Sequence, residues 1–102
     1  MGAATALLLA QKGASVAISG RREEILREIA SRKGEEDVLL THPADVADRG
    51  SLERLFHWFD QELGELNILV NAAGINIPKR AIDELSAKDW DAVLKINLTG
   101  AF

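Results

Sequence analysis

Residues 67–74 of this 102-residue chain join a short apolar run to amide and small side chains. Ile68, Leu69 and Val70 follow one another without polar alternation, which is typical of a strand that is buried on both faces. The segment Asn71–Gly74 that comes next has almost no side-chain bulk. Two interpretations are open at this point. One is a parallel strand whose carboxyl end meets a bound ligand, and the other is a buried strand followed by an ordinary turn.

Asn97 also stands out, because its amide falls among apolar residues at helical spacing. That apolar stripe is made by Trp90, Val93, Leu94 and Leu98. A primary amide on a buried helix face costs about 1–3 kcal/mol unless it is hydrogen-bonded. We therefore expect Asn97 to have a partner, which would be a neighbouring carbonyl, an ordered water or a ligand.

The elements that must position these residues alternate along the chain. Apolar spacing and end signals predict four helices: one ending at Lys12-Gly13, one from Arg21 to Gly34, one from an N-cap at Asp48 to Gly64, and one starting at the capping box Ser86–Asp89. Strands are predicted at residues 16–20, 38–41 and 68–71. The buried helix faces are expected to carry Ile25, Leu26 and Ile29, then Leu52, Leu55, Phe56, Phe59 and Leu63, then the stripe around Asn97 with Ala101.

Strict alternation of helix and strand with short connections indicates βαβ units, which form a parallel sheet with helices on both faces. The fold class is therefore α/β. No repeat, linker or low-complexity tract divides the chain, so residues 1–102 are expected to form a single domain.

The composition excludes several classes of function. The net charge is −4 and no basic cluster interleaves with aromatic residues, so a nucleic-acid surface is not expected. There are no cysteines, which excludes disulfides and thiolate metal sites. His42 and His57 lack metal-ligand spacing. No apolar run is long enough to span a bilayer, and the expected location is the cytoplasm.

Several of these pieces, taken in order, resemble the short-chain dehydrogenase/reductase family. They are Gly2–Ala6 before the first helix, Gly20-Arg21-Arg22 after the first strand, Asp45-Val46 after the second, Asn71-Ala72-Ala73-Gly74 after the third, and Ile96-Asn97-Leu98 in the last helix. The resemblance implies a Rossmann-type doubly wound parallel sheet that binds NAD(P). The match spans the whole chain but only the front part of a family domain.

The resemblance assigns cofactor-binding roles to residues near the ends of the strands. Gly2 would let the cofactor pyrophosphate approach the N-terminus of the first helix, where the dipole favours an anion. Its alternative role is that of any small residue after an initiator Met. Asp45 would accept a hydrogen bond from the adenine amine and Val46 would contact the ring, whereas without the family Asp45 is a turn residue. The segment of Asn71, Ala72, Ala73 and Gly74 would pass beside the cofactor.

Arg21 and Arg22 bear on the choice between the two nicotinamide cofactors. An NAD site places an acidic residue at the end of the second family strand, about 20 positions after the glycine turn. That position falls at Gly20–Arg22, where no acid is present. A guanidinium suits a 2′-phosphate instead, so NADP(H) is favoured over NAD(H), with Arg21 ahead of Arg22. The alternative is a pair of solvated arginines that open a helix.

The resemblance also implies what the chain lacks. Of the family's catalytic residues only the asparagine matches, at Asn97, and the chain contains no Tyr for the Tyr-x-x-x-Lys pair. The expected function is a cofactor-binding fragment of an oxidoreductase that acts on a carbonyl or secondary alcohol, inactive by itself. The alternative is a non-catalytic remnant or an association module, with weak or no nucleotide binding. It would form a homo-oligomer through the last helix, anchored by Trp90 and Phe102.

The first family strand is expected to be absent from this chain. It would lie between the strands at 16–19 and 68–71, so its absence leaves two facing edges with unpaired backbone groups. Either these edges close on each other or a gap persists. In both cases we expect a chain that is marginally stable or prone to aggregation by itself.

Overall fold

Two parallel strands form the sheet of the computed structural model, which describes residues 1–102. β1 (Val16–Gly20) pairs with β2 (Leu39–Pro43), with Val16 opposite Leu39 and Gly20 opposite Pro43. Both strands lie close to their predicted positions. Their carboxyl ends therefore reach the same edge of the sheet, next to Ala44 and Asp45.

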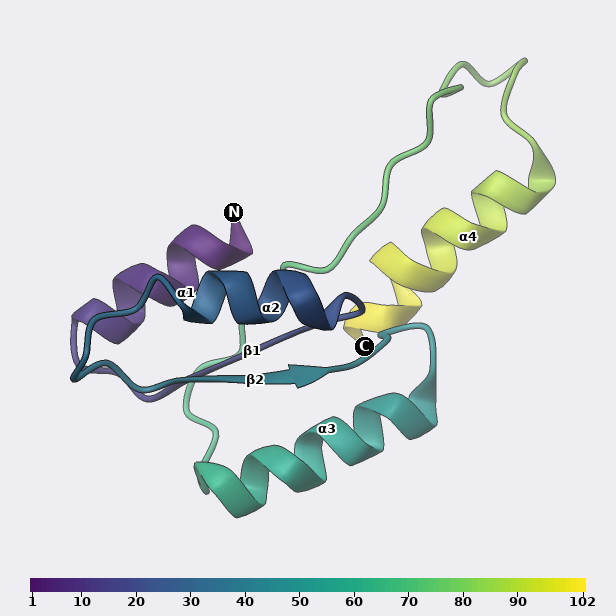
Figure 1. Ribbon diagram of the computed structural model, residues 1–102. Coiled ribbons are helices and arrows are strands. Elements are labelled where there is room, and N and C mark those ends of the chain that lie inside the picture. The colour runs from purple at the N-terminus through teal and green to yellow at the C-terminus, as the bar shows by residue number, and fades with distance from the viewer.

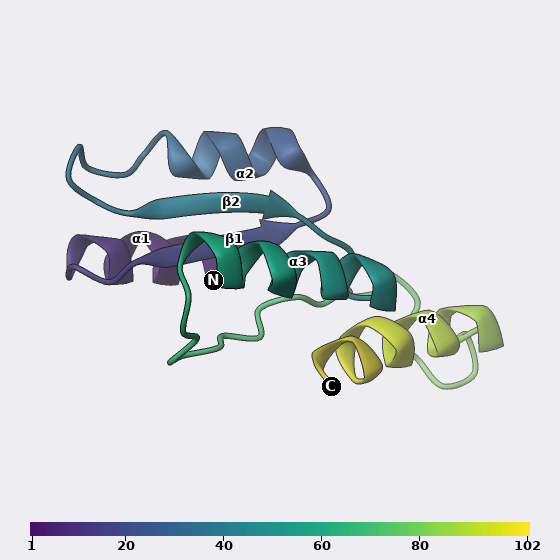
Figure 2. The same ribbon diagram turned by 90° about the horizontal axis from the view of Figure 1, so that it is seen from below.

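Four α-helices and a short 3₁₀ helix surround this sheet. They are α1 (Gly2–Gln11), α2 (Glu23–Ala30), α3 (Arg49–Glu62), α4 (Ala87–Asn97) and the 3₁₀ helix η1 (Thr99–Ala101). Figure 1 shows α1 and α2 on one face of the sheet and α3 on the other. The turned view in Figure 2 shows the two strands running side by side between the helices. Helices on both faces of a parallel pair confirm the α/β, doubly wound class.

The predicted helix ends are confirmed in most places. Gly13 and Gly64 follow α1 and α3 with φ of 87° and 76°, a region that favours glycine. The Asp48 carboxylate accepts a hydrogen bond from Gly50 N at 3.0 Å and caps α3, and Ser86 Oγ accepts one from Asp89 N at 3.1 Å and caps α4. One predicted end is wrong. The sequence placed the end of this helix at Gly34, whereas α2 stops at Ala30 and Gly34 lies in the loop that follows.

The hydrophobic core lies between α1, α2 and the sheet. Ala6, Ala10 and Leu39 are buried together, and the partly buried side chains that pack against them are Leu7, Val16, Ile18, Ile29 and Ala30. Only six of the 102 residues are buried. Ile25 and Phe56, which were expected inside, belong to the exposed large hydrophobic residues. The apolar faces of α2 and α3 are therefore only partly covered.

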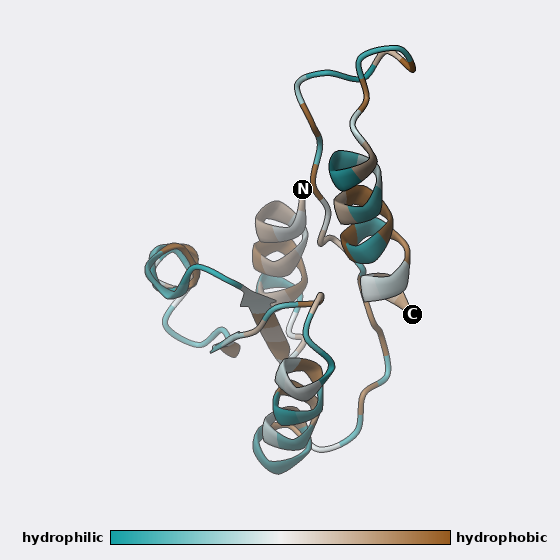
Figure 3. Cartoon of the chain, turned by 90° about the vertical axis from the view of Figure 1, so that its right-hand side faces the viewer, coloured by the Kyte–Doolittle hydropathy of each residue, from teal (hydrophilic) through white to brown (hydrophobic).

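The predicted third strand is not formed. Residues 65–71 run extended from the end of α3, but they join no sheet, and Ile68, Leu69 and Val70 are 70%, 59% and 52% exposed. The hydrophobic colour along this segment in Figure 3 shows that its sequence suits a buried strand. Because no neighbouring backbone offers ladder hydrogen bonds, the segment stays single. Of the two outcomes left open by the sequence, closure of the edges or a gap, the structure has the gap.

The last helix also departs from its prediction. α4 contains no buried residue, and Trp90, Leu94 and Leu98 are all exposed. Figure 1 shows that α4 and the loop before it extend away from the sheet. The radius of gyration of 15.5 Å exceeds the value of about 13 Å that is usual for a compact domain of 100 residues. None of the helices combines the length and the apolar character of a membrane-spanning segment.

Candidate functional site

The loop after β2 is held in a fixed shape at the carboxyl edge of the sheet. Ala44 N donates to Gly20 O at 3.0 Å, which ties this loop to the end of β1. Asp45 N donates to Ser51 Oγ at 3.0 Å, and Asp45 Oδ1 accepts from Ala47 N at 2.9 Å. The Asp45 carboxylate therefore keeps Oδ2 available to a ligand donor. Ser51 lies in α3, is 9% exposed and holds the loop through this hydrogen bond. Nothing in the sequence predicted this role.

Val46, next in this loop, contacts the end of the last helix. A Cβ placed on Gly100 would lie 2.8 Å from Val46 Cγ2 and 3.1 Å from Val46 O. Only a residue without a side chain allows this approach. Gly100 therefore connects η1 to the loop of Asp45 and Val46, a role that the sequence did not reveal.

The N-terminus of α1 meets the small-residue segment 71–74. A Cβ placed on Gly2 would lie 3.0 Å from Ala72 Cβ, so the two backbones come close together. Met1 occupies the N-cap position and no side chain caps the helix. The first N–H groups of α1 are thus without a side-chain acceptor at the point where the helix dipole is positive. Such a terminus suits an anion.

Asn97 is the last residue of α4, and its side chain is hydrogen-bonded to the loop that follows Gly74. Ile75 N donates to Asn97 Oδ1 at 2.8 Å, and Asn97 Nδ2 donates to Ile75 O at 2.9 Å. The expected partner therefore exists, and it is the backbone of Ile75. The expected burial is wrong, since Asn97 is exposed. The α-helix ends here and η1 follows after Leu98.

Arg21 and Arg22 lie directly after β1, at the same edge of the sheet as Asp45. Both side chains are exposed, and neither has a carboxylate oxygen within 4.0 Å, because the two ion pairs of the chain are Arg27–Glu23 and Arg54–Asp48. Arg22 is the N-cap residue of α2 and makes no capping hydrogen bond. Both guanidinium groups can therefore meet an incoming anion.

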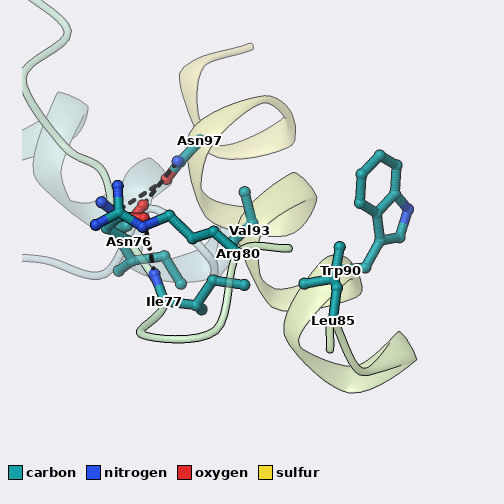
Figure 4. Close-up of a pocket in the computed structure, with 8 residues that line it drawn as sticks. Asn76, Ile77, Arg80, Leu85, Trp90, Val93 and Asn97 are labelled. Carbon is teal, nitrogen blue, oxygen red and sulfur yellow. Dashed lines mark hydrogen bonds between the residues drawn. The ribbon is translucent and has the colours of Figure 1, made fainter. Parts of the chain in front are cut away.

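A cavity of about 220 Å³ adjoins Asn97. It is lined by Ile75, Asn76, Ile77, Arg80, Leu85, Trp90, Val93 and Asn97. Figure 4 shows Trp90 and Leu85 toward one end and Asn76 and Asn97 toward the other. The cavity is thus apolar at one end and polar at the other. The sequence did not predict that Arg80 lines a cavity, because residues 75–80 were expected only to form a loop.

The predicted residues fall into two connected groups. Gly2 meets Ala72, and Asn97 holds Ile75 directly after Gly74, which brings α1, α4 and the segment 71–74 together. Val46 joins this group through Gly100, while Arg21 and Arg22 stand next to the Asp45 loop at the end of β1. No cluster of three or more His, Asp or Glu side chains could hold a metal ion.

Comparison with known proteins gives matches along the whole chain. The family model described as short chain dehydrogenase matches residues 1–102. A 2,3-dihydro-2,3-dihydroxybenzoate dehydrogenase from Bacillus subtilis is 34% identical over 103 aligned positions, which cover 100% of this chain and 39% of that protein.

Solved structures give the same result. A short chain dehydrogenase from Bacillus anthracis has a TM-score of 0.89 at 31% identity, over 99% of this chain and 42% of that one. An actinorhodin polyketide ketoreductase variant with NADPH has a TM-score of 0.90 at 30% identity, over 99% and 39% of the two chains. The chain thus spans about two-fifths of the length of these relatives, from 39% to 42%.

Proposed function

Because the chain belongs to the short-chain dehydrogenase family, we propose that it is the cofactor-binding part of an oxidoreductase. The reaction would interconvert a carbonyl compound and a secondary alcohol. A bound nicotinamide dinucleotide would supply or accept the hydride. The observation that carries this proposal is the close approach of the uncapped α1 N-terminus to Ala72 at Gly2.

The α1 terminus would bind the pyrophosphate of the dinucleotide. Its first N–H groups lack a side-chain acceptor, and the helix dipole favours negative charge there. Gly2 and the small residues Ala72, Ala73 and Gly74 leave the backbone accessible, since none of them places bulk in front of the helix. These small residues leave room for a phosphate group, and the N-terminus of α1 supplies the positive partial charge. Asn71 begins this segment and would lie beside the same cofactor.

The loop after β2 would bind the adenine. Asp45 Oδ1 is engaged with Ala47 N, so Oδ2 would accept the hydrogen bond of the adenine amine. Val46 is held by Gly100 and would cover the ring with an apolar side chain. The tie from Ala44 N to Gly20 O keeps this loop beside the end of β1, where the ribose would lie.

Arg21 and Arg22 favour NADP(H) over NAD(H). The end of β1 carries two guanidinium groups without carboxylate partners and no acid that could accept from a ribose 2′-hydroxyl. A guanidinium pairs with a phosphate through two parallel hydrogen bonds, which supports a 2′-phosphate here. Arg21, the residue next to β1, is the primary candidate.

Asn97 would act as a positioning residue. Its amide is fully engaged with the N–H and C=O of Ile75, so it fixes the backbone directly after the proposed cofactor segment. The family's other catalytic groups have no match in this chain, which contains no Tyr. We therefore expect no turnover when the chain is assayed with NADPH and a panel of carbonyl compounds.

A second candidate function is supported by the exposure of the last helix. Trp90 and Leu98 are 51% and 66% exposed, and Phe102 is exposed as well, which suits association through α4. The chain would then be a non-catalytic association module that forms a homo-oligomer. The exposed apolar side chains of α4 favour this association role. The close approach of Gly2 to Ala72 gives no support to it.

Titration with NADPH and NADH distinguishes the two. We expect quenching or enhancement of NADPH fluorescence on binding, with NADPH bound more tightly than NADH. Gly2→Val should abolish binding of both, since its side chain would enter the space before Ala72. Ala4→Val, at an exposed position of the same helix, should not. Equal binding by the Gly2→Val variant, or no binding by the unmodified chain, would contradict the cofactor role and favour association.

A further inference from the structure

Ser51 is the one buried polar residue of the chain, and its hydroxyl holds the backbone of Asp45. Asp45 N donates to Ser51 Oγ at 3.0 Å. Ser51 lies in the first turn of α3, whose start is fixed by the Asp48 cap. A buried hydroxyl is kept where it has a hydrogen-bond partner. The start of α3 is therefore attached to the loop that carries Asp45.

The Asp45 carboxylate is also held by its own loop. Its Oδ1 accepts from Ala47 N at 2.9 Å, a local turn that aspartate side chains often make. Asp48 N donates to Asp45 O at 3.0 Å and closes the same turn. The turn fixes the carboxylate relative to the loop, and Ser51 fixes the loop relative to α3. Together they set the direction of Oδ2, which has no hydrogen bond or ion pair within the chain.

A carboxylate oxygen with a fixed direction can distinguish two purine bases. An ionised carboxylate accepts hydrogen bonds and donates none. The 6-position of adenine carries an amine, which donates, whereas that of hypoxanthine carries a carbonyl oxygen, which accepts. Rejection of the second base requires that the carboxylate cannot turn away from it, because selectivity depends on an unfavourable contact with the wrong ligand.

We propose that Ser51 is a positioning residue through which Asp45 selects adenine over hypoxanthine in the bound dinucleotide. Without the hydroxyl, Asp45 N would lose its acceptor, and the loop could rotate to relieve the unfavourable contact. This inference rests on the proposed function, because Asp45 meets a base only if the cofactor binds at this loop. It adds a specificity residue that lies in α3 and touches no ligand.

Titration with NADPH and with its hypoxanthine analogue tests the inference. The two ligands differ only at the base, and both report binding through the fluorescence of the reduced nicotinamide. The unmodified chain should bind NADPH about tenfold more tightly. Ser51→Ala should weaken NADPH alone, so that the ratio of the two dissociation constants approaches one, and Ser51→Thr, which keeps the hydroxyl, should retain the ratio. Ser31→Ala removes an exposed hydroxyl at the end of α2 and should leave the ratio unchanged.

Asp45→Asn separates positioning from a general effect on stability. The amide keeps Oδ1 for Ala47 N and replaces Oδ2 by a donor, so this variant should favour the hypoxanthine analogue. Adding Ser51→Ala should bring the inverted ratio back toward one. If Ser51 only stabilised the fold, its removal would weaken both ligands equally and leave both ratios in place, and that result would overturn the inference.

Hydrogen exchange at Asp45 N tests the same contact without any nucleotide. It should become about tenfold faster in the Ser51→Ala variant. Unchanged exchange, or an unchanged ratio with NADPH still bound, would reject the role of Ser51 alone. Faster exchange in a chain that binds neither dinucleotide would reject the cofactor role, and the selection of adenine with it.

Discussion

Asn97 shows how one side chain can set the path of a loop. Both functions of its amide are used on the same residue, Ile75, which it holds across 22 positions of sequence. An amide presents a donor and an acceptor side by side, so it pairs with a peptide group as a neighbouring strand would. The loop after Gly74 is thereby attached to the end of α4, although neither partner is buried.

Asn97→Ala should release this loop. Each hydrogen bond contributes about 0.5–1.5 kcal/mol in net terms, and the lower value applies here because the site is exposed. We expect hydrogen exchange at Ile75 N to become roughly fivefold faster, which corresponds to a loss of about 1 kcal/mol. Asn67→Ala, an exposed amide without a hydrogen bond in the chain, is the control. Unchanged exchange at Ile75 would show that the contact does not restrain the loop.

Arg21→Asp tests the choice of cofactor at the scale of one residue. The change removes a guanidinium that would face a 2′-phosphate and supplies an acceptor for a ribose 2′-hydroxyl. The ratio of the dissociation constants for NADPH and NADH should shift toward NADH by about tenfold or more. Arg32→Asp, at another exposed arginine beyond the end of α2, should leave the ratio unchanged. A ratio that does not move in the Arg21→Asp variant would reject the assignment.

Among the elements, those with local signals were predicted well. Asp48, Ser86, Gly13 and Gly64 each act within one helical turn, and all four do what the sequence indicates. The segment 68–71 has the composition of a buried strand, yet a strand requires hydrogen bonds from a neighbour, and no neighbour lies beside it. Composition can therefore predict that a segment suits a sheet, but not that a partner is present.

The same distinction holds for the candidate site. The resemblance brought out Gly2, Asn71–Gly74 and Asn97, and the structure brings these residues together. The resemblance did not reveal Gly100 or Ser51, because the role of each depends on a contact with the loop after β2 that the sequence does not show. The exposure of α4 was missed for the same reason: its apolar stripe is real, but nothing in the chain covers it.

Gly100→Ala should detach η1 from the loop after β2. The new Cβ would lie 2.8 Å from Val46 Cγ2, and overpacking of this kind costs typically about 1–3 kcal/mol. The end of α4 should then open more often, so trypsin should cleave after Lys95 several-fold faster. Val46→Ala in the same chain should restore only part of the resistance, because Val46 Cβ and O would remain 3.1 Å away. A cleavage rate equal to that of the unmodified chain would contradict the contact.

The whole molecule buries few of its residues, six of 102, and leaves many large hydrophobic side chains exposed. Its buried core has five hydrophobic residues, none of them with a large side chain fully enclosed. The extended segment 68–70 is both apolar and free of ladder hydrogen bonds. Such a segment can pair with another chain as an unprotected strand edge does. The isolated chain should therefore unfold without a sharp transition and associate as its concentration rises.

Val70→Lys distinguishes association through strand-edge pairing from non-specific association through exposed apolar surface. A lysine in the extended segment opposes strand association, so size-exclusion chromatography with light scattering should show a larger monomer fraction at equal concentration. Leu8→Lys removes an equally exposed apolar side chain from α1, whose interior backbone is already hydrogen-bonded within the helix. It should therefore have a smaller effect. Equal effects of the two changes would assign the association to exposed apolar surface in general. A monomeric chain with a cooperative two-state melt would mean that the gap beside β1 costs the fold little.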